Sequence, residues 1–506
     1  MTESTNLSTP TLKNALAWSG LSNLVLRVGT LSMGIVLARI LSPEDFGVYA
    51  VALTVQTILM TMADFGLSAD LIRSKDHERR APTVATLGVL TGLIFATSMA
   101  FSSTFVANSM GSPEASDVIF ILSFTLVLSG VGIVPYAKLQ RNFEQKKIFS
   151  ISMVDFIVST TVTILLLVLG LGVISLAYAR IAAQACAVVL QFILARQGLK
   201  FGYNRSLVMS VLKFGGPIAA ANLLSWSLLS VDNVVIARLA GPVSLGFYVL
   251  AFNISNWPMS ALGQVIRSVS LPAFSRAAGE GNGQNLTTAV ALTWGIGLPA
   301  GLFLAVLSEP LISLIYGEKW SLAAPVLAAL GIFGAFRLVF DVWVAYLLAC
   351  GKSLAVLLVQ IVWFCSLIPA MIAATHLFGI VGGGWAHVVV GVMVVLPAYI
   401  WALRGTRADL RGLAKVGWPP VLAGVPTWFV AHFVANLVSS PILAIGLGGI
   451  AGGAVYVALL FRWYARIVRS ALLMKQGANN HVADVIGNVS NGLNPRSDAI
   501  TESSST

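Results

Sequence analysis

Three arginines lie inside long apolar stretches of this sequence, where a charge is costly. Arg27, Arg180 and Arg337 each have mostly uncharged neighbours on both sides. An ionised side chain at the centre of a transmembrane helix costs about 2.5 to 3.5 kcal/mol on insertion scales, so such residues are expected to face protein or a water-filled cavity. Together they predict a basic interior, which suits an anionic, hydroxyl-rich solute.

Three acids are expected at the same depth, Asp155, Asp232 and Asp341. An acid there can bind a coupling proton or sodium ion, or it can pair with an arginine. For Asp155 and Asp232 both alternatives stay open, and we favour structural pairing. Asp341 follows Arg337 by four residues, a spacing that allows an ion pair along one helix face. For Arg337, a structural role and a binding role therefore both stay open. Arg27 has no acid within one turn and is the favoured binding residue.

Neutral polar and aromatic side chains could complete such a cavity. Asn23, Asn222 and Asn253 could hydrogen-bond sugar hydroxyls, although bonding between helices is the commoner use of intramembrane amides. Trp226 could stack on a sugar ring. Pro258 removes one backbone hydrogen bond in the middle of an apolar stretch and predicts a hinge.

The elements that must position these residues are transmembrane helices. The chain has 506 residues, of which 57% are hydrophobic and only 10% charged, and its mean hydropathy is +0.86. A soluble domain has roughly 25% charged residues. Stretches of roughly twenty apolar residues are long enough to cross a bilayer core of about 30 Å. We expect an all-α protein with fourteen spans, centred in 16–38, 46–64, 83–107, 117–137, 149–170, 173–195, 214–237, 245–266, 287–308, 322–349, 354–375, 380–402, 416–437 and 441–461.

The distribution of basic residues predicts the topology. A net charge of +11 could indicate a nucleic-acid partner. With fourteen spans and a cytosolic N-terminus, however, only Arg39, Arg238 and Lys319 fall in outer connections, three more of the 31 Lys and Arg lie within spans, and the rest are cytosolic. This is the positive-inside distribution of a membrane protein. We therefore expect both termini in the cytosol and no nucleic-acid partner.

An internal repeat organises the spans. The segments ARILSPEDFGVYAVA (Ala38–Ala52) and ARLAGPVSLGFYVLA (Ala237–Ala251) share six identical residues at a constant offset of 199 positions. Each joins an outward span to an inward one, so the duplication predicts two like-oriented bundles, a transporter architecture. The repeated prolines suit an outer turn, the glycines a close helix contact and the tyrosines the membrane interface: Pro43 and Pro242, Gly47 and Gly246, Tyr49 and Tyr248.

These features predict five segments. They are a cytosolic N-terminal segment (1–12), an N-terminal six-helix bundle (13–200), a C-terminal six-helix bundle (201–405), two additional transmembrane helices (406–475) and a cytosolic tail (476–506). The tail is rich in Asn, Ser and Gly, which predicts disorder.

The motifs of enzymes are missing from the sequence. The predicted outer loops are too short to hold the catalytic groups of a polymerase or ligase. Gly351-Lys352-Ser353 resembles the end of a phosphate loop, but Tyr346 stands where its first glycine is required. No spacing of His, Cys and Asp indicates a metal site. We expect no enzyme, cofactor or metal.

The chain resembles the Wzx-like oligosaccharide flippases of bacterial polysaccharide synthesis, within the superfamily that also holds multidrug exporters and lipid II flippases. The resemblance covers about residues 12–400. It depends on the motifs ARILSPEDFGVY followed by DFGL, LQRNF, SVDNVVIARLAGPVSLGFYVLAFNISNWP, LPAFSR and YGEKW.

The resemblance implies a specific activity. Such proteins move undecaprenyl-diphosphate-linked oligosaccharides from the inner to the outer leaflet of the cytoplasmic membrane by alternating access, alongside a polysaccharide polymerase and chain-length machinery. Arg27 is then the first candidate to engage the diphosphate, and Arg180 and Arg337 are further candidates. A multidrug or cation exporter and a lipid II flippase are alternatives, and a membrane polysaccharide polymerase or ligase is an alternative of another class.

Overall fold

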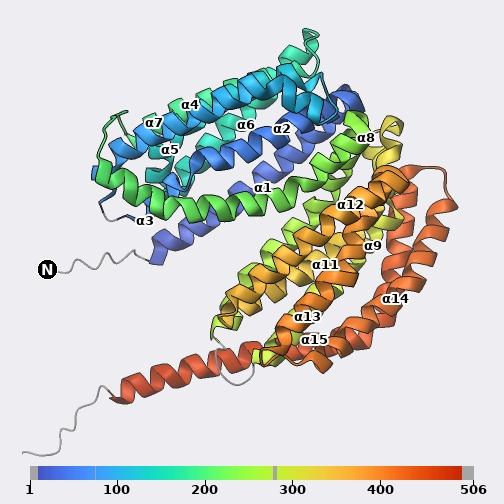
Figure 1. Ribbon diagram of the computed structural model, residues 1–506. Helices are drawn as coiled ribbons and strands as arrows, with labels where there is room; N and C mark the ends of the chain where they lie inside the picture. The colour runs from blue at the N-terminus through green and yellow to red at the C-terminus, as the bar shows by residue number, and fades with distance from the viewer. Residues whose placement is uncertain (1–8, 75, 277–281, 493–506) are drawn as a thin grey trace, which may run out of the picture. The chain divides into compact units, whose positions relative to one another are not determined.

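The computed structural model describes residues 9–74, 76–276 and 282–492, and every regular element in these ranges is a helix (Figure 1). A 3-10 helix covers Glu318–Ala323 and a π-helical turn covers Gly391–Val395. The α-helices are α1 (Thr9–Ile40), α2 (Pro43–Asp64), α3 (Leu67–Arg73), α4 (His77–Ser109), α5 (Ala115–Arg141), α6 (Gln145–Val168), α7 (Ile174–Ala195), α8 (Arg205–Arg276), α9 (Asn282–Val306), α10 (Ser308–Ile315), α11 (Ala324–Ala349), α12 (Ser353–Val390), α13 (Leu396–Arg404), α14 (Leu410–Asn436) and α15 (Pro441–Gly492).

The number of long helices agrees with the sequence. Two helices contain a residue with non-helical dihedral angles, Gly241 in α8 and Gly379 in α12. Dividing both helices at these glycines gives four helices, and α13 continues the second part of α12. Without the short α3 and α10, the described chain then has fourteen long helices. Ten helical stretches of the described residues are long and apolar enough to cross a membrane. The predicted all-α membrane class is confirmed.

Two compact units divide the chain. One contains residues 1–255, 308–330 and 363–390, and the other contains 256–307, 331–362 and 391–506. Each unit consists of several separate segments of the sequence. These segments do not correspond one to one to the bundles that we predict at 13–200 and 201–405, so the bundle boundaries stay predictions. One division falls inside α8, directly before Pro258. α8 continues as a helix through that proline, and the hinge stays a prediction.

The first unit is held together by close helix contacts. α4 packs on α5, α5 and α6 pack on α7, and α2 also contacts α5 (Figure 1). The α4–α5 contact depends on glycine: a Cβ atom on Gly88 would lie 2.9 Å from the carbonyl oxygen of Gly130, and one on Gly92 would lie 2.7 Å from that of Leu126. Because the hydrophobic effect does not drive helices together within a membrane, close van der Waals packing at small residues holds them in contact.

The second unit packs α14 and α15 against each other and against α9. The indole nitrogen of Trp294 in α9 donates to the carbonyl oxygen of Gly417 at 3.0 Å, and the Tyr464 hydroxyl donates to that of Gly295 at 2.5 Å. A Cβ atom on Gly448 would lie 3.0 Å from the carbonyl oxygen of Ala431. Gly448 therefore serves helix packing.

The C-terminal segment differs in part from its prediction. α15 continues to Gly492, so residues 476–492 of the segment that we expected to be disordered are helical. Residues 493–506 lie outside the described part of the chain.

Candidate functional site

A cavity of about 720 Å³ opens within the first unit, between α1, α2, α6, α7 and the first part of α8. Arg180 from α7 and Asp155 from α6 form an ion pair in its wall, with Nη1 and Oδ2 3.3 Å apart. The two side chains are 35% and 29% exposed, so both are open to the cavity. Neutral polar side chains also line the cavity: Thr30, Thr54, Thr57, Ser152, Ser159, Thr160, Ser230, Asn233 and Asn253.

The charge of this cavity differs from the expected basic interior. Arg180 and Asp155 are the charged residues among the lining side chains that the structure describes, and their formal charges cancel. Aromatic rings complete the wall, Trp226 among them. The cavity is therefore polar and rich in hydroxyl groups, with one guanidinium group that is shared with a carboxylate.

Arg27 lies beside this cavity without being part of its wall. It belongs to α1, where its neighbours Leu26 and Thr30 do line the cavity. Thr30 Oγ1 donates to the backbone oxygen of Arg27 at 3.0 Å, and the arginine side chain is half-buried. The role that we predict for Arg27 stays a prediction.

The three predicted amides are placed differently. Asn253 lines the cavity. Asn222 is an exposed residue of α8. Asn23 belongs to α1, but its side chain lies outside the described part of the structure.

Arg337 and Asp341 belong to the second unit, where both are half-buried residues of α11. Arg337 Nη1 lies 3.4 Å from Oδ1 of Asn256 in the same unit. The three arginines are thus distributed over two units, and a single groove formed by all three stays a prediction.

Asp232 takes part in a buried polar network in the first unit. The Tyr248 hydroxyl donates to Asp232 Oδ2 at 3.0 Å and lies 3.0 Å from Nε2 of His387, which is itself 3.8 Å from the carboxylate. The backbone N–H of Asn233 donates to Asp232 Oδ1 at 2.9 Å. Asp232, Tyr248 and His387 are 3%, 0% and 5% exposed.

Two members of this network are not among the site residues that the sequence predicts. Tyr248 was expected at the membrane interface, and its burial shows that this prediction was wrong. Its place in the repeat was the only signal that it mattered. His387 carries no local signal, because it lies 139 positions from its partner Tyr248.

The two copies of the repeat meet a third segment at the turns that join their helices. Trp320 is fully buried, and its indole nitrogen donates to the backbone oxygen of Ala38 at 2.7 Å. Its ring makes edge contacts with Phe46, from the first copy, and Phe247, from the second, at centroid distances of 5.5 and 5.7 Å. The tryptophan therefore joins the two copies.

Charged residues fasten the same segment. Arg39 donates to the backbone oxygens of Leu314 and Ile315, at 2.6 and 3.0 Å, where α10 ends. Lys319 donates to the backbone oxygens of Arg39 and Leu41, at 3.0 and 2.8 Å. Nearby, burial raises the pKa of the Tyr316 hydroxyl to about 12. Arg39 and Lys319 therefore stabilise a turn and are not part of the cavity wall.

No group of three or more His, Cys, Asp or Glu side chains in the described residues is placed to hold a metal ion.

Known proteins are similar to this chain in sequence or in fold. The succinoglycan biosynthesis transport protein ExoT of Rhizobium meliloti (strain 1021) is 25% identical over 502 residues, 96% of this chain and 99% of that protein. The lipopolysaccharide biosynthesis protein WzxC of Escherichia coli (strain K12) is 24% identical over 425 residues, 82% of this chain and 86% of that protein.

A solved structure of the lipid II flippase MurJ in an inward closed conformation has a TM-score of 0.74 at 16% identity. It covers 90% of this chain and is itself matched over its whole length. This likeness shows the fold alone. The family model of polysaccharide biosynthesis proteins matches residues 36–325, more than half of the sequence. On this match, the chain belongs to the family of polysaccharide biosynthesis proteins.

Proposed function

We propose that this protein flips undecaprenyl-diphosphate-linked oligosaccharides from the inner to the outer leaflet of the bacterial cytoplasmic membrane. Family membership and relatives named for succinoglycan transport and lipopolysaccharide biosynthesis support the polysaccharide pathway. The observation that carries the proposal is the cavity of the first unit, where a guanidinium group stands among hydroxyl and amide side chains.

The ion pair in the cavity suits an exchange of partners. Its 3.3 Å separation is longer than the roughly 2.7 to 2.9 Å of a strong charge-assisted hydrogen bond. Since both side chains are about one-third exposed, water screens their attraction. A diphosphate entering the cavity competes with Asp155 for Arg180 and offers more acceptor oxygens than a carboxylate does. The surrounding Ser, Thr and Asn side chains then hydrogen-bond the sugar hydroxyls.

The size and the energetics fit this substrate class. A volume of about 720 Å³ lies within the range of roughly 300 to 1,000 Å³ of ligand pockets. Moving two negative charges outward across a membrane that is negative inside by about 100 mV releases about 4.6 kcal/mol, at about 2.3 kcal/mol per charge. On this account export requires no nucleotide. Alternating access supplies the path, with Pro258 as a hinge next to the division in α8.

Arg180→Ala tests the proposal in a strain that lacks the chromosomal gene. We expect loss of surface polysaccharide and accumulation of lipid-linked oligosaccharide, the latter measured by mass spectrometry of extracted lipids. Arg238→Ala is the matched control, because Arg238 is an exposed arginine of the outer repeat turn in the same unit. Normal polysaccharide in a well-expressed Arg180→Ala strain would contradict the proposal.

A further inference from the structure

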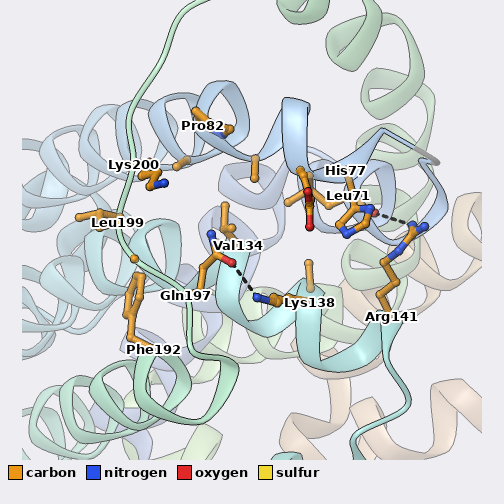
Figure 2. A pocket seen from close by; sticks show the side chains of 15 residues that line it. Leu71, His77, Pro82, Val134, Lys138, Arg141, Phe192, Gln197, Leu199 and Lys200 are labelled. Atoms are coloured by element: carbon orange, nitrogen blue, oxygen red, sulfur yellow. Dashed lines mark hydrogen bonds between the residues drawn. The ribbon is translucent and has the colours of Figure 1, made fainter.

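A second pocket in the first unit, of about 330 Å³, shares none of its lining residues with the cavity described above (Figure 2). Its walls come from the first turns of α4, the last turns of α5, the end of α7 and the following segment 197–200. All these segments border connections that the positive-inside distribution assigns to the cytosol. The pocket is large enough for a small ligand or a lipid headgroup.

Basic side chains from three separate segments meet at this pocket. Figure 2 shows Lys138 and Arg141 on α5, Lys200 on the segment after α7 and His77 at the start of α4. Glu78 is the acid among the lining residues that the structure describes. Lys138, Arg141 and Lys200 bring three positive charges to the pocket, and Glu78 brings one negative charge. The pocket therefore has a positive potential that favours an anion.

The hydrogen bonds of Lys138 and Arg141 go to neutral atoms. Lys138 Nζ donates to the side-chain oxygen of Gln197 at 3.1 Å. Arg141 Nη1 donates to the backbone oxygens of Ile72 and Ser74, at 2.8 and 2.6 Å. Neutral acceptors orient a cation but do not compensate its charge, which a partly buried site otherwise obtains from a counter-ion. The positive end of the α4 dipole adds to the same field, because α4 begins at His77.

The segment that carries Lys200 is fastened to the pocket wall. The backbone N–H of Gly202 donates to the oxygen of Pro82 at 3.1 Å, and Thr86 Oγ1 donates to the oxygen of Gly202 at 2.9 Å. Both partners belong to α4. Lys200 is thus held near the pocket before any ligand arrives, which lowers the entropy cost of binding.

We propose that this pocket binds a phosphate group, carried by an anionic phospholipid of the cytosolic leaflet. The cations recognise the phosphate, while Phe192, Leu199 and Pro82 supply apolar surface for the glycerol and upper acyl carbons. A soluble phosphate compound has the same charged chemistry but makes no use of this apolar wall. This inference is independent of the transported substrate, because the cavity of Arg180 is a separate space.

The test is lipid binding to the purified full-length protein in a neutral detergent, measured by native mass spectrometry. The probes are phosphatidylglycerol, phosphatidylcholine with the same acyl chains, and inorganic phosphate, with thermal unfolding as a second measurement. We expect phosphatidylglycerol to bind better than phosphatidylcholine, and the double variant Lys138→Gln, Lys200→Gln to weaken that binding about tenfold or more. Lys213→Gln, an exposed lysine of the same unit outside the pocket, is the matched control and should bind like the parent.

A variant of opposite sign separates local electrostatics from misfolding. Glu78→Gln removes the lining acid and should strengthen phosphatidylglycerol binding. If inorganic phosphate stabilises the parent but not the double variant while lipid binding is equal in both, the site is a phosphate site for a soluble compound. Equal response of the parent and the double variant to every probe would overturn the proposal.

Discussion

Gly47 and Gly246 occupy equivalent positions in the two copies of the repeat, and each lies against the backbone of the other copy. A Cβ atom on Gly47 would overlap the carbonyl oxygen of Pro242, and one on Gly246 would overlap that of Pro43. The same two Cβ atoms would lie 3.1 and 3.2 Å from the backbone nitrogens of Gly246 and Gly47. The duplication therefore produces a reciprocal contact in which the two copies interlock.

This reciprocity predicts matched effects of substitution. Gly47→Ala and Gly246→Ala should each lower the free energy of unfolding by about 1 to 3 kcal/mol, because the added methyl group meets backbone that has to shift. Thermal unfolding of the purified protein in detergent measures the loss. The control is Gly34→Ala in α1, where a Cβ atom meets no other atom within 4 Å. Unfolding temperatures of all three variants equal to that of the parent would refute the interlocked contact.

The contact also separates features that local sequence signals predict from features that depend on tertiary structure. Fourteen long helices and the duplication were predictable, because hydropathy, helix length and a repeated motif are local signals. The close helix contact assigned to Gly47 and Gly246 depended on the same motif. The residues that these glycines contact are distant in the sequence, so the spacing of residues in one sequence does not predict them.

From residue type alone, the sequence predicts residues of the candidate site, but it does not predict which of them pair with one another. Arg180 and Asp155 were both selected because intramembrane charges are rare, yet their pairing joins residues 25 positions apart on two helices. Tyr248 was assigned to the membrane interface because a tyrosine near a turn usually serves there. Trp320 appeared only as part of a motif, and its contact with Ala38 spans 282 positions.

Trp320 should make a large contribution to stability. Trp320→Ala removes a fully buried ring that contacts both copies of the repeat, so we expect the free energy of unfolding to fall by about 3 to 5 kcal/mol. Trp320→Phe keeps much of the ring but loses the hydrogen bond to Ala38, which should cost about 1 to 2 kcal/mol. Chemical denaturation followed by circular dichroism gives both values. Trp401→Phe, at a 62% exposed site, is the control, and an equally large loss there would mean that the measurement reports tryptophan content and not this contact.

The cavity ion pair separates two roles of Asp155. If the acid only balances Arg180, Asp155→Asn makes the cavity more positive, and export of an anionic substrate should continue at a rate close to that of the parent. Stability should change by no more than about 1 kcal/mol, since both partners are about one-third exposed. Surface polysaccharide in a complemented deletion strain measures export. Loss of export as complete as in Arg180→Ala would instead assign Asp155 an essential task, such as carrying a coupling proton or sodium ion.

The buried network around Asp232, unlike the partly exposed ion pair, should contribute to the stability of the fold. Tyr248→Phe removes the hydroxyl that donates to the carboxylate and leaves an acceptor buried at 3% exposure without that donor. We expect a loss of about 1 to 3 kcal/mol in the free energy of unfolding, the usual cost of a buried polar group that loses its partner. Tyr178→Phe is the matched control, because Tyr178 is 46% exposed in the same unit. A Tyr248→Phe protein as stable as the control would show that the hydrogen bond does not stabilise the fold. A role in transport would then be the remaining explanation for the burial of Asp232, Tyr248 and His387.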